Sequence, residues 1–224
     1  MRPDYGMSLV YIFAASRMEA EPVRKMVGSA DLTSPASCGP NNLVFVVSGM
    51  GPRNARSKAE VALGSRTEPS VSPKPNAVLI IGLCGGLTES LPEGRVVAYT
   101  ACKSTETTKP ILNCSPTVSD SLVTLLASSG IPCDRAVGIT APRIATNRKE
   151  RLALAELGAA TVDMESYSIL EAATATGVPV AVLRVVADDL DRVLPDLNRA
   201  LNEDGAVLMP GRPCWLPCGP LCGP

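Results

Sequence analysis

The sequence predicts a single α/β domain with a mostly parallel, mixed central sheet that is flanked by helices on both faces. Short apolar runs alternate along the chain with segments whose apolar residues recur at helical spacing, an order typical of a sheet covered by helices. Hydrophobic residues make up 46% of the 224 residues, but aromatic residues only 3%. A core of Val, Leu, Ile and Ala suits the buried strands of such a sheet, and the length suits one domain.

Each expected strand is an apolar run bounded by polar residues or glycine. The expected strands are residues 9–15, 43–48, 77–81, 95–101, 136–140, 161–164 and 180–186. The expected helices are residues 18–27, 52–63, 119–129, 148–157 and 166–176. Pro52 fits the first turn of its helix, where no backbone N–H is needed, and Asn147 can cap the helix that follows it.

We expect the domain to span residues 1–210 and to be followed by a poorly ordered tail at 211–224. The tail reads GRPCWLPCGPLCGP, a composition typical of a loosely packed chain end. Its prolines oppose a helix that would bring Cys214, Cys218 and Cys222 to one face, so we expect no metal site there.

The composition argues against several classes of function. Lys plus Arg is 21 and Asp plus Glu is 22, giving a net charge of −1, without the basic excess of nucleic-acid binders. No apolar run reaches the ~18 residues that span a membrane, and residues 1–8 lack the pattern of a secretory signal. We therefore expect a cytoplasmic protein that has no membrane span and does not bind nucleic acid.

The cysteines and the absence of histidine narrow the chemistry further. Cys38, Cys84, Cys102, Cys114 and Cys133 are scattered and form no CxxC pair, so we expect free thiols in a reducing compartment. Without histidine, a His-based triad and a His-containing metal site are excluded. Acid–base catalysis must therefore use Asp, Glu, Lys, Tyr or Cys. We expect neither a metal nor another cofactor.

Four polar segments follow expected strands, where α/β sheets bind ligands. They are MEAE at 18–21, SGMGPR at 48–53, VDMES at 162–166 and RVVADD at 184–189. Taken singly, each has a structural explanation: acidic residues in a first helical turn, a tight turn, a solvated turn, and a buried Arg–carboxylate pair. Asp163 and Glu165 are expected to point to the same side, and glycines before a helix can bring backbone N–H groups to an anion.

Together these segments resemble the purine nucleoside phosphorylase and nucleosidase superfamily over residues 10–191. The most specific likeness is VDMES followed by RVVAD, while IIGLCGGL at 80–87 is similar to the family's central strand and Gly-rich turn. MEAE is similar to the acidic segment of the methylthioadenosine/adenosylhomocysteine nucleosidases. The short connection at 103–117 and the run at 194–207 resemble the hopanoid-associated phosphorylases, whose substrate is an adenosyl group on a large lipid.

The resemblance implies cleavage of the N-glycosidic bond of a purine, adenosine-type nucleoside through an oxocarbenium-like transition state. Asp188 would then protonate the departing base at N7, a step that contributes about 10²–10⁴ in rate. Glu21 corresponds to the carboxylate that activates water in the nucleosidases. The resemblance also implies a set of substrate-binding residues. Glu165 would hold the ribose hydroxyls, Met164 would pack on the sugar face, and Arg184 would lie near the ribose and the nucleophile. The backbone would come close to the ligand at Cys84, Gly85 and Gly86, and would run along the purine at Ile144 and Ala145.

The nucleophile separates two versions of this reaction. We expect phosphorolysis, with inorganic phosphate as co-substrate held by Gly49, Gly51, Arg53 and Arg17. Hydrolysis of a methylthioadenosine- or adenosylhomocysteine-type nucleoside is the alternative. Two further alternatives are a catalytically inactive nucleoside-binding relative and a thiol-based redox or metal protein that depends on the Cys-rich tail.

The sequence departs from the family pattern in two places and is poor in aromatics. Position 187 is Ala, where the family usually has Ser, and position 142 is Pro, where Asp is common. With four Tyr, two Phe and one Trp, few rings are available to stack on a base. The base pocket is therefore expected to be weakly specific or completed by a partner subunit, and by analogy we expect a homodimer or a larger homo-oligomer.

Overall fold

The computed structural model describes residues 8–28, 36–38, 41–64 and 73–200. The expected tail at 211–224 lies outside the described residues. The strands are β1 (Ser8–Ala14), β2 (Ala36–Cys38), β3 (Asn41–Val47), β4 (Ala77–Gly86), β5 (Val96–Ser104), β6 (Leu112–Asn113), β7 (Cys133–Thr140), β8 (Thr161–Asp163) and β9 (Val180–Asp188). The helices are α1 (Arg17–Met26), α2 (Pro52–Leu63), α3 (Pro116–Ser128), α4 (Arg148–Ala155) and α5 (Ser166–Ala175), followed by the 3-10 turn η1 (Leu197–Ala200).

The strands form one mixed sheet in which five of them close into a circuit. β4 pairs in parallel with β9 and in antiparallel fashion with β8, and β9 pairs in antiparallel fashion with β5. β5 and β8 both pair in parallel with β7, which completes the circuit. β1, β3 and the short β2 extend the sheet from β4. The mixed sheet is as expected; the circuit, which brings β8 and β9 to opposite sides of β4, was not predicted.

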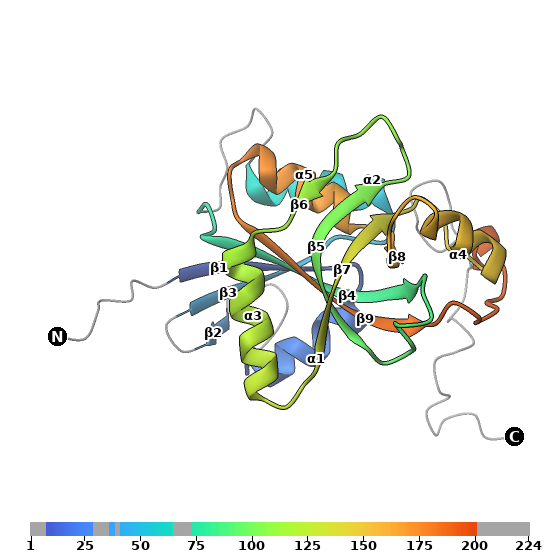
Figure 1. Ribbon diagram of the computed structural model, residues 1–224. Coiled ribbons are helices and arrows are strands. Elements are labelled where there is room, and N and C mark those ends of the chain that lie inside the picture. The colour runs from blue at the N-terminus through green and yellow to red at the C-terminus, as the bar shows by residue number, and fades with distance from the viewer. Residues whose placement is uncertain (1–7, 29–35, 39–40, 65–72, 201–224) are drawn as a thin grey trace, which may run out of the picture.

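Helices cover both faces of this sheet, as the sequence predicts (Figure 1). Neighbouring residues of a strand point to opposite faces. Tyr11 and Phe13 of β1 belong to a buried apolar cluster that includes residues of α2 and α5. Ile12 and Ala14, which alternate with them, belong to a second cluster that includes Ala20 of α1. The alternation therefore places α2 and α5 on one face of β1 and α1 on the other.

The Gly-rich segment after Ile81 is a strand and not the turn that we expected. β4 continues to Gly86 and pairs with β9 up to Gly85 opposite Asp188, with a register shift after Cys84. Gly82 is required because its φ is +146° and a Cβ there would lie 2.5 Å from the nearest atoms of Arg184 and Glu19. Glycine thus lets β4 pass close to two charged side chains.

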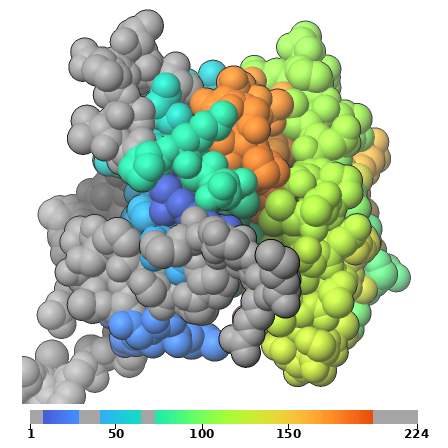
Figure 2. Space-filling model, turned by 90° about the vertical axis from the view of Figure 1, so that its left-hand side faces the viewer, coloured from blue at the N-terminus to red at the C-terminus, as the bar shows by residue number. Residues whose placement is uncertain are grey.

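The amino ends of β1, β4 and β9 lie at the face shown in Figure 2. There the segment that enters β4 (teal) lies beside the segment that enters β9 (orange), because the Val78 N–H donates to the Pro179 carbonyl at 2.9 Å. α3 is tied to the same region by a 2.7 Å hydrogen bond from the Ser115 N–H to the Val180 carbonyl. The polar segments that follow β1, β3 and β9 therefore lie at the opposite end of the domain.

Four cysteines are free thiols, as expected: Cys84, Cys102, Cys114 and Cys133. The side chain of Cys38 lies outside the described part of the chain. Burial raises the pKa of Cys84 and of Cys114 to about 12. Both thiols are therefore protonated near neutral pH and are poor nucleophiles.

Candidate functional site

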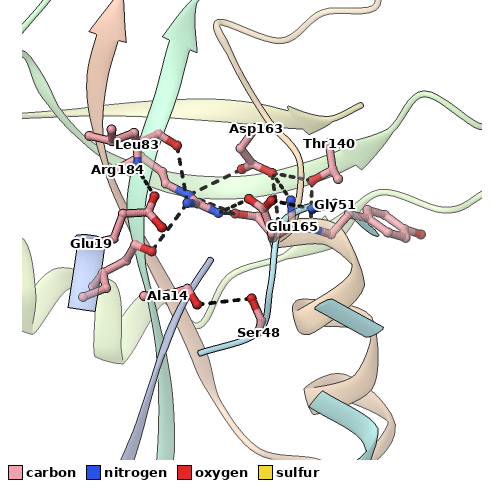
Figure 3. A network of polar contacts seen from close by, with 12 residues as sticks. Ala14, Glu19, Ser48, Gly51, Leu83, Thr140, Asp163, Glu165 and Arg184 are labelled. Carbon is pink, nitrogen blue, oxygen red and sulfur yellow. Dashed lines mark hydrogen bonds and ion pairs between the residues drawn. The ribbon is translucent and has the colours of Figure 1, made fainter. Parts of the chain in front are cut away.

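Arg184 of β9 is the centre of a buried polar cluster (Figure 3). Its side chain is 1% exposed, and two carboxylates face its guanidinium: Asp163 Oδ2 lies 3.6 Å from Nε and Glu165 Oε2 lies 3.7 Å from Nη2. The Ser166 hydroxyl accepts a hydrogen bond from Nη2 at 2.8 Å. Burial alone lowers the pKa of Arg184, but the charges of Asp163 and Glu165 raise it overall. The guanidinium therefore stays charged, with partners that a buried cation requires.

Asp163 fixes the turn between β8 and α5. Its Oδ1 accepts the backbone N–H groups of Glu165 at 3.0 Å and Ser166 at 2.9 Å, and the Thr140 hydroxyl at 2.8 Å. Thr140 in turn accepts the Tyr167 N–H at 2.9 Å. With Oδ1 occupied by these donors, Oδ2 faces Arg184. Asp163 and Glu165 thus point to the same cation, as their spacing predicts.

Glu165 links this cluster to the start of α2. Its Oε1 accepts the Gly51 N–H at 2.9 Å, so the carboxylate lies at the positive end of the α2 dipole. Burial, the largest effect, raises the pKa of Glu165 to about 7, although the charge of Arg184 opposes the rise. Gly51 can present its N–H in this way because glycine tolerates the φ of +86° found there. This N–H, which we expected to hold phosphate, is instead engaged by a carboxylate.

Glu19 also belongs to this cluster, although the sequence did not predict it as a site residue. Its Oε1 accepts the Leu83 N–H of β4 at 3.0 Å, and its Oε2 accepts the Ser16 N–H at 2.9 Å. The Ser16 hydroxyl oxygen in turn accepts the Glu19 N–H, so the two residues form a capping box at the start of α1. The Ser-x-x-Glu spacing predicts a capping box, but the contact with β4 could not be read from it.

The structure does not bring Glu21 or Arg17 into the cluster. Glu21 forms a 2.6 Å ion pair with Arg24 on the surface of α1, where its side chain is 35% exposed. That hydrogen bond lowers the pKa of Glu21. Arg17 is exposed, and so is Arg53 on α2. The expected roles of these residues in water activation and phosphate binding stay predictions.

Asp188, at the end of β9, lies against a second buried arginine. Arg151 of α4 forms an ion pair with Asp188 Oδ2, and the Arg151 side chain is 1% exposed while that of Asp188 is 18% exposed. Nη1 of Arg151 also donates to the carbonyl oxygens of Asp189 at 2.8 Å and Asp188 at 3.2 Å. The sequence reading missed Arg151, because a charged residue in a helix is most often exposed.

The Arg184 cluster and the Arg151–Asp188 pair both have residues beside the end of β4. Gly85 pairs with Val162, which precedes Asp163, on one side and with Asp188 on the other. The charges of Arg184, Asp163 and Asp188 all act on the pKa of Cys84, next to Gly85. The sheet therefore brings the two groups to the same stretch of β4, and a cavity shared by Glu165 and Asp188 stays a prediction.

Ile144 has both of its backbone hydrogen-bonding groups engaged by one side chain. The Ile144 N–H donates to Asn198 Oδ1 at 2.9 Å, and Asn198 Nδ2 donates to the Ile144 carbonyl at 3.0 Å. Asn198 lies in η1, which follows β9. A purine aligned along Ile144, as the sequence reading expects, would have to displace this carboxamide.

Other expected site residues are buried or tightly packed. Met164 is 9% exposed and Ala145 is 8% exposed. A Cβ on Gly86 would lie 2.6 Å from the Leu91 carbonyl, so its close approach in this structure is to the chain itself. Gly49 has a φ of +81° and lies next to Asn54. These positions leave their expected ligand contacts as predictions.

No cluster of cysteine and carboxylate side chains in residues 8–28, 36–38, 41–64 and 73–200 has the arrangement of a metal site. Within the same ranges, every helix is too short or too polar to traverse a lipid bilayer.

Comparison with known proteins identifies the family. The model of the phosphorylase superfamily matches residues 26–206, which is more than half of the chain. The chain therefore belongs to the phosphorylase superfamily, and the resemblance seen in the sequence is confirmed at that level. No curated protein matches the chain.

Solved structures share the fold at low sequence identity. The 5'-methylthioadenosine/S-adenosylhomocysteine nucleosidase of Campylobacter jejuni has a TM-score of 0.73 and 15% identity, covering 86% of this chain and 91% of that one. The Helicobacter pylori nucleosidase of the same name has a TM-score of 0.69 and 17% identity, covering 83% and 87%. A futalosine hydrolase mutant of H. pylori has a TM-score of 0.69 and 16% identity, covering 83% and 87%. These likenesses establish the fold.

Proposed function

We propose that the protein cleaves the N-glycosidic bond of an adenosine-type nucleoside. The observation that carries this proposal is that two groups lie beside the last residues of β4: three carboxylates gathered at Arg184, and Asp188 beside Arg151. Breaking a ribosidic bond builds positive charge on the sugar and negative charge on the base. A carboxylate cluster suits the sugar, and a separate acid suits the base.

Each group then has a distinct task. Asp188 delivers a proton to N7 of the departing purine. Glu165 holds the ribose hydroxyls, because a carboxyl whose pKa is about 7 can accept or donate a hydrogen bond near neutrality. Glu19, in place of Glu21, takes the proton of the attacking nucleophile, and Arg184 holds Glu165 and Asp163 in place.

We propose that water, and not phosphate, is the nucleophile. Glu19, Asp163 and Glu165 surround the single cation Arg184 in the described cluster, and Glu165 engages the Gly51 N–H. A phosphate with about 1.5–2 negative charges would meet carboxylates where it needs donors. Phosphorolysis is the second candidate, and the superfamily to which the chain belongs supports it.

The names of the structural relatives suggest the group on the ribose. The relatives from C. jejuni and H. pylori are nucleosidases of 5'-methylthioadenosine and S-adenosylhomocysteine, so we propose these two nucleosides as the first substrates to test. The hopanoid-type substrate, an adenosyl group on a large lipid, is the next. We also propose a homodimer, because the chain offers few aromatic side chains to complete a base pocket alone.

A nucleoside panel tests the proposal. Purified protein is incubated with 5'-methylthioadenosine, S-adenosylhomocysteine, adenosine and inosine, with and without phosphate, and free base and sugar products are separated by chromatography. We expect adenine release that does not depend on phosphate, with free ribose derivatives as the second product. Strict dependence on phosphate with formation of a ribose 1-phosphate would establish phosphorolysis, and no release of base from any nucleoside would overturn the proposed function.

A further inference from the structure

We propose that Arg151 is a positioning residue for the reaction: it holds Asp188 so that one carboxyl oxygen faces the base, and it stabilises the carboxylate that forms when the proton leaves. This inference rests on the proposed function. Arg151 itself touches no reacting atom in the proposal; it acts through Asp188.

The burial of Arg151 is the first observation. Neighbouring Arg148 of α4 is 45% exposed and pairs with Asp191 and Glu89 at the surface, as expected for a helical arginine. The side chain of Arg151, one turn later, is 1% exposed. A buried guanidinium destabilises the fold unless it is paired, so its contacts indicate which groups it holds.

The contacts of Arg151 converge on the place where Asp188 sits. Nη2 pairs with Asp188 Oδ2. Nη1 donates to the carbonyl oxygens of Asp189 at 2.8 Å, Asp188 at 3.2 Å and Gly86 at 3.4 Å. One side chain thus binds both the backbone and the carboxylate of Asp188 and ties them to the end of β4.

Gly85 makes room for this pair. A Cβ at Gly85 would lie 3.0 Å from Asp188 Oδ2 and 3.1 Å from Arg151 Nη1. Such contacts are tighter than ordinary van der Waals packing, so a side chain at this position would push the pair out of place. The close approach at Gly85 therefore serves the two charged groups.

The pairing leaves one oxygen of Asp188 available. Oδ2 is engaged by Arg151, whereas Oδ1 receives no hydrogen bond from the part of the chain that the structure describes. The side chain is 18% exposed, so the pairing with Arg151 does not bury the carboxylate completely. Because the guanidinium is planar and contacts backbone and carboxylate together, it restrains the direction in which Oδ1 points.

Proton transfer from Asp188 and attack by water together break the bond between the ribose and the base. The proton passes from Oδ1 of Asp188 to N7 of the purine, and the electron pair of the O–H bond stays on the carboxylate. The electron pair of the bond between the ribose and the base goes to the base, and water forms a bond to the ribosyl carbon as it gives its proton to Glu19. Negative charge that forms on Asp188 lies next to Arg151, where it is stabilised as the transition state is reached.

A double-mutant cycle tests the proposal with the full-length protein and an adenine nucleoside. The variants are Arg151→Met, Asp188→Asn and the double variant, with Arg148→Met as the matched control on the same helix. We expect Arg151→Met to lower kcat about 100-fold with KM changed less than about 3-fold. In the Asp188→Asn background, Arg151→Met should change kcat less than about 3-fold, because the effects of two residues that act through each other do not add. Arg148→Met should resemble the wild type.

A second substrate separates positioning from folding. The leaving group of p-nitrophenyl β-ribofuranoside departs without a proton, so Arg151→Met should lower its kcat much less than that of the adenine nucleoside. Arg151→Lys should restore part of the lost kcat, and thermal unfolding will show whether each variant is folded. Gly85→Ala keeps both charges but displaces them. It should likewise lower kcat more for the adenine nucleoside than for p-nitrophenyl β-ribofuranoside. Equal losses on both substrates, or additive losses in the cycle, would overturn the proposal; a wild-type protein that cleaves no nucleoside would instead overturn the proposed function.

Discussion

The Gly51 N–H and the Glu165 carboxylate are joined by a 2.9 Å hydrogen bond across 114 positions of sequence. The bond connects the start of α2 to the start of α5, two helices on the same face of the sheet. It also ties two sequence motifs, SGMG and VDMES, that have no connection when each is considered alone. A glycine-rich turn that suggests an anion site thus binds an anion that the protein itself supplies.

The buried Glu165 makes the stability of the protein depend on pH. Burial raises its pKa from 4.5 to about 7, so between these values the folded protein binds a proton more tightly than the unfolded chain. Stability from this group is therefore present at low pH and is lost as pH rises through about 7. Since Gln cannot ionise, the Tm of Glu165→Gln minus that of the wild type should increase from about pH 5 to about pH 8.

Thermal unfolding at several pH values measures this difference. Glu156→Gln, at the exposed residue that follows the last residue of α4, is the control and should show a constant Tm difference. If the Tm difference between Glu165→Gln and the wild type does not change with pH, the pKa of Glu165 is not raised.

The backbone at Gly82 is predicted to be intolerant of any side chain. A Cβ there would meet Arg184 Nη1 and Glu19 Oε1, each at 2.5 Å, so Gly82→Ala must displace at least one of the two. Gly94 has a φ of +87° and nothing within 4 Å of its Cβ position, which makes Gly94→Ala a control for backbone strain alone. We expect Gly94→Ala to lower the free energy of unfolding by about 1–2 kcal/mol and to keep its activity.

Gly82→Ala should be less stable than Gly94→Ala in urea unfolding, and its kcat should fall at least about 10-fold because the cluster is misplaced. Equal stability and activity of the two variants would show that the cluster adapts freely and that the close packing at Gly82 is unimportant.

The pattern of apolar residues predicted most of the elements because burial on one or both faces leaves a periodic signal. β1, β9 and α5, for example, begin and end within about two residues of the expected limits. The short strands β2 and β6, of three and two residues, leave no such signal. The circuit of five strands was missed because pairing between distant strands depends on the direction in which each runs, which periodicity does not encode.

The site was predicted less evenly than the fold. Asp163, Glu165 and Arg184 were found because charged residues stand out beside a buried strand. Glu19 and Arg151 were missed because each lies in a helix, where a charge is usually solvated and the face it occupies is set by packing. The glycines of β4 were the available hint, since Gly82 and Gly85 make room for these side chains.

The two glutamates of α1 make the assignment of the base testable. Glu19 contacts β4 and Glu21 pairs with Arg24 at the surface, so the proposed function gives the proton-accepting role to Glu19. We expect Glu19→Gln to lower kcat by about 10²–10⁴ and Glu21→Gln to change it less than about 3-fold. Steady-state kinetics with 5'-methylthioadenosine measures both. The reverse order of effects would return the role to Glu21 and would mean that α1 rotates when the substrate binds.

Asn198 is predicted to compete with the base. Its carboxamide presents an acceptor to the Ile144 N–H and a donor to the Ile144 carbonyl, and the edge of adenine has the same adjacent acceptor and donor. Free adenine must therefore displace Asn198 if it aligns with Ile144. Asn198→Ala removes a competitor that makes two hydrogen bonds, so we expect it to bind adenine about 3–10-fold more tightly by calorimetry. Val193→Ala, which alters a 74% exposed side chain nearby in the chain, should bind adenine as the wild type does. Weaker binding by Asn198→Ala would show that the carboxamide contacts the bound base, and equal binding would show that adenine does not use Ile144.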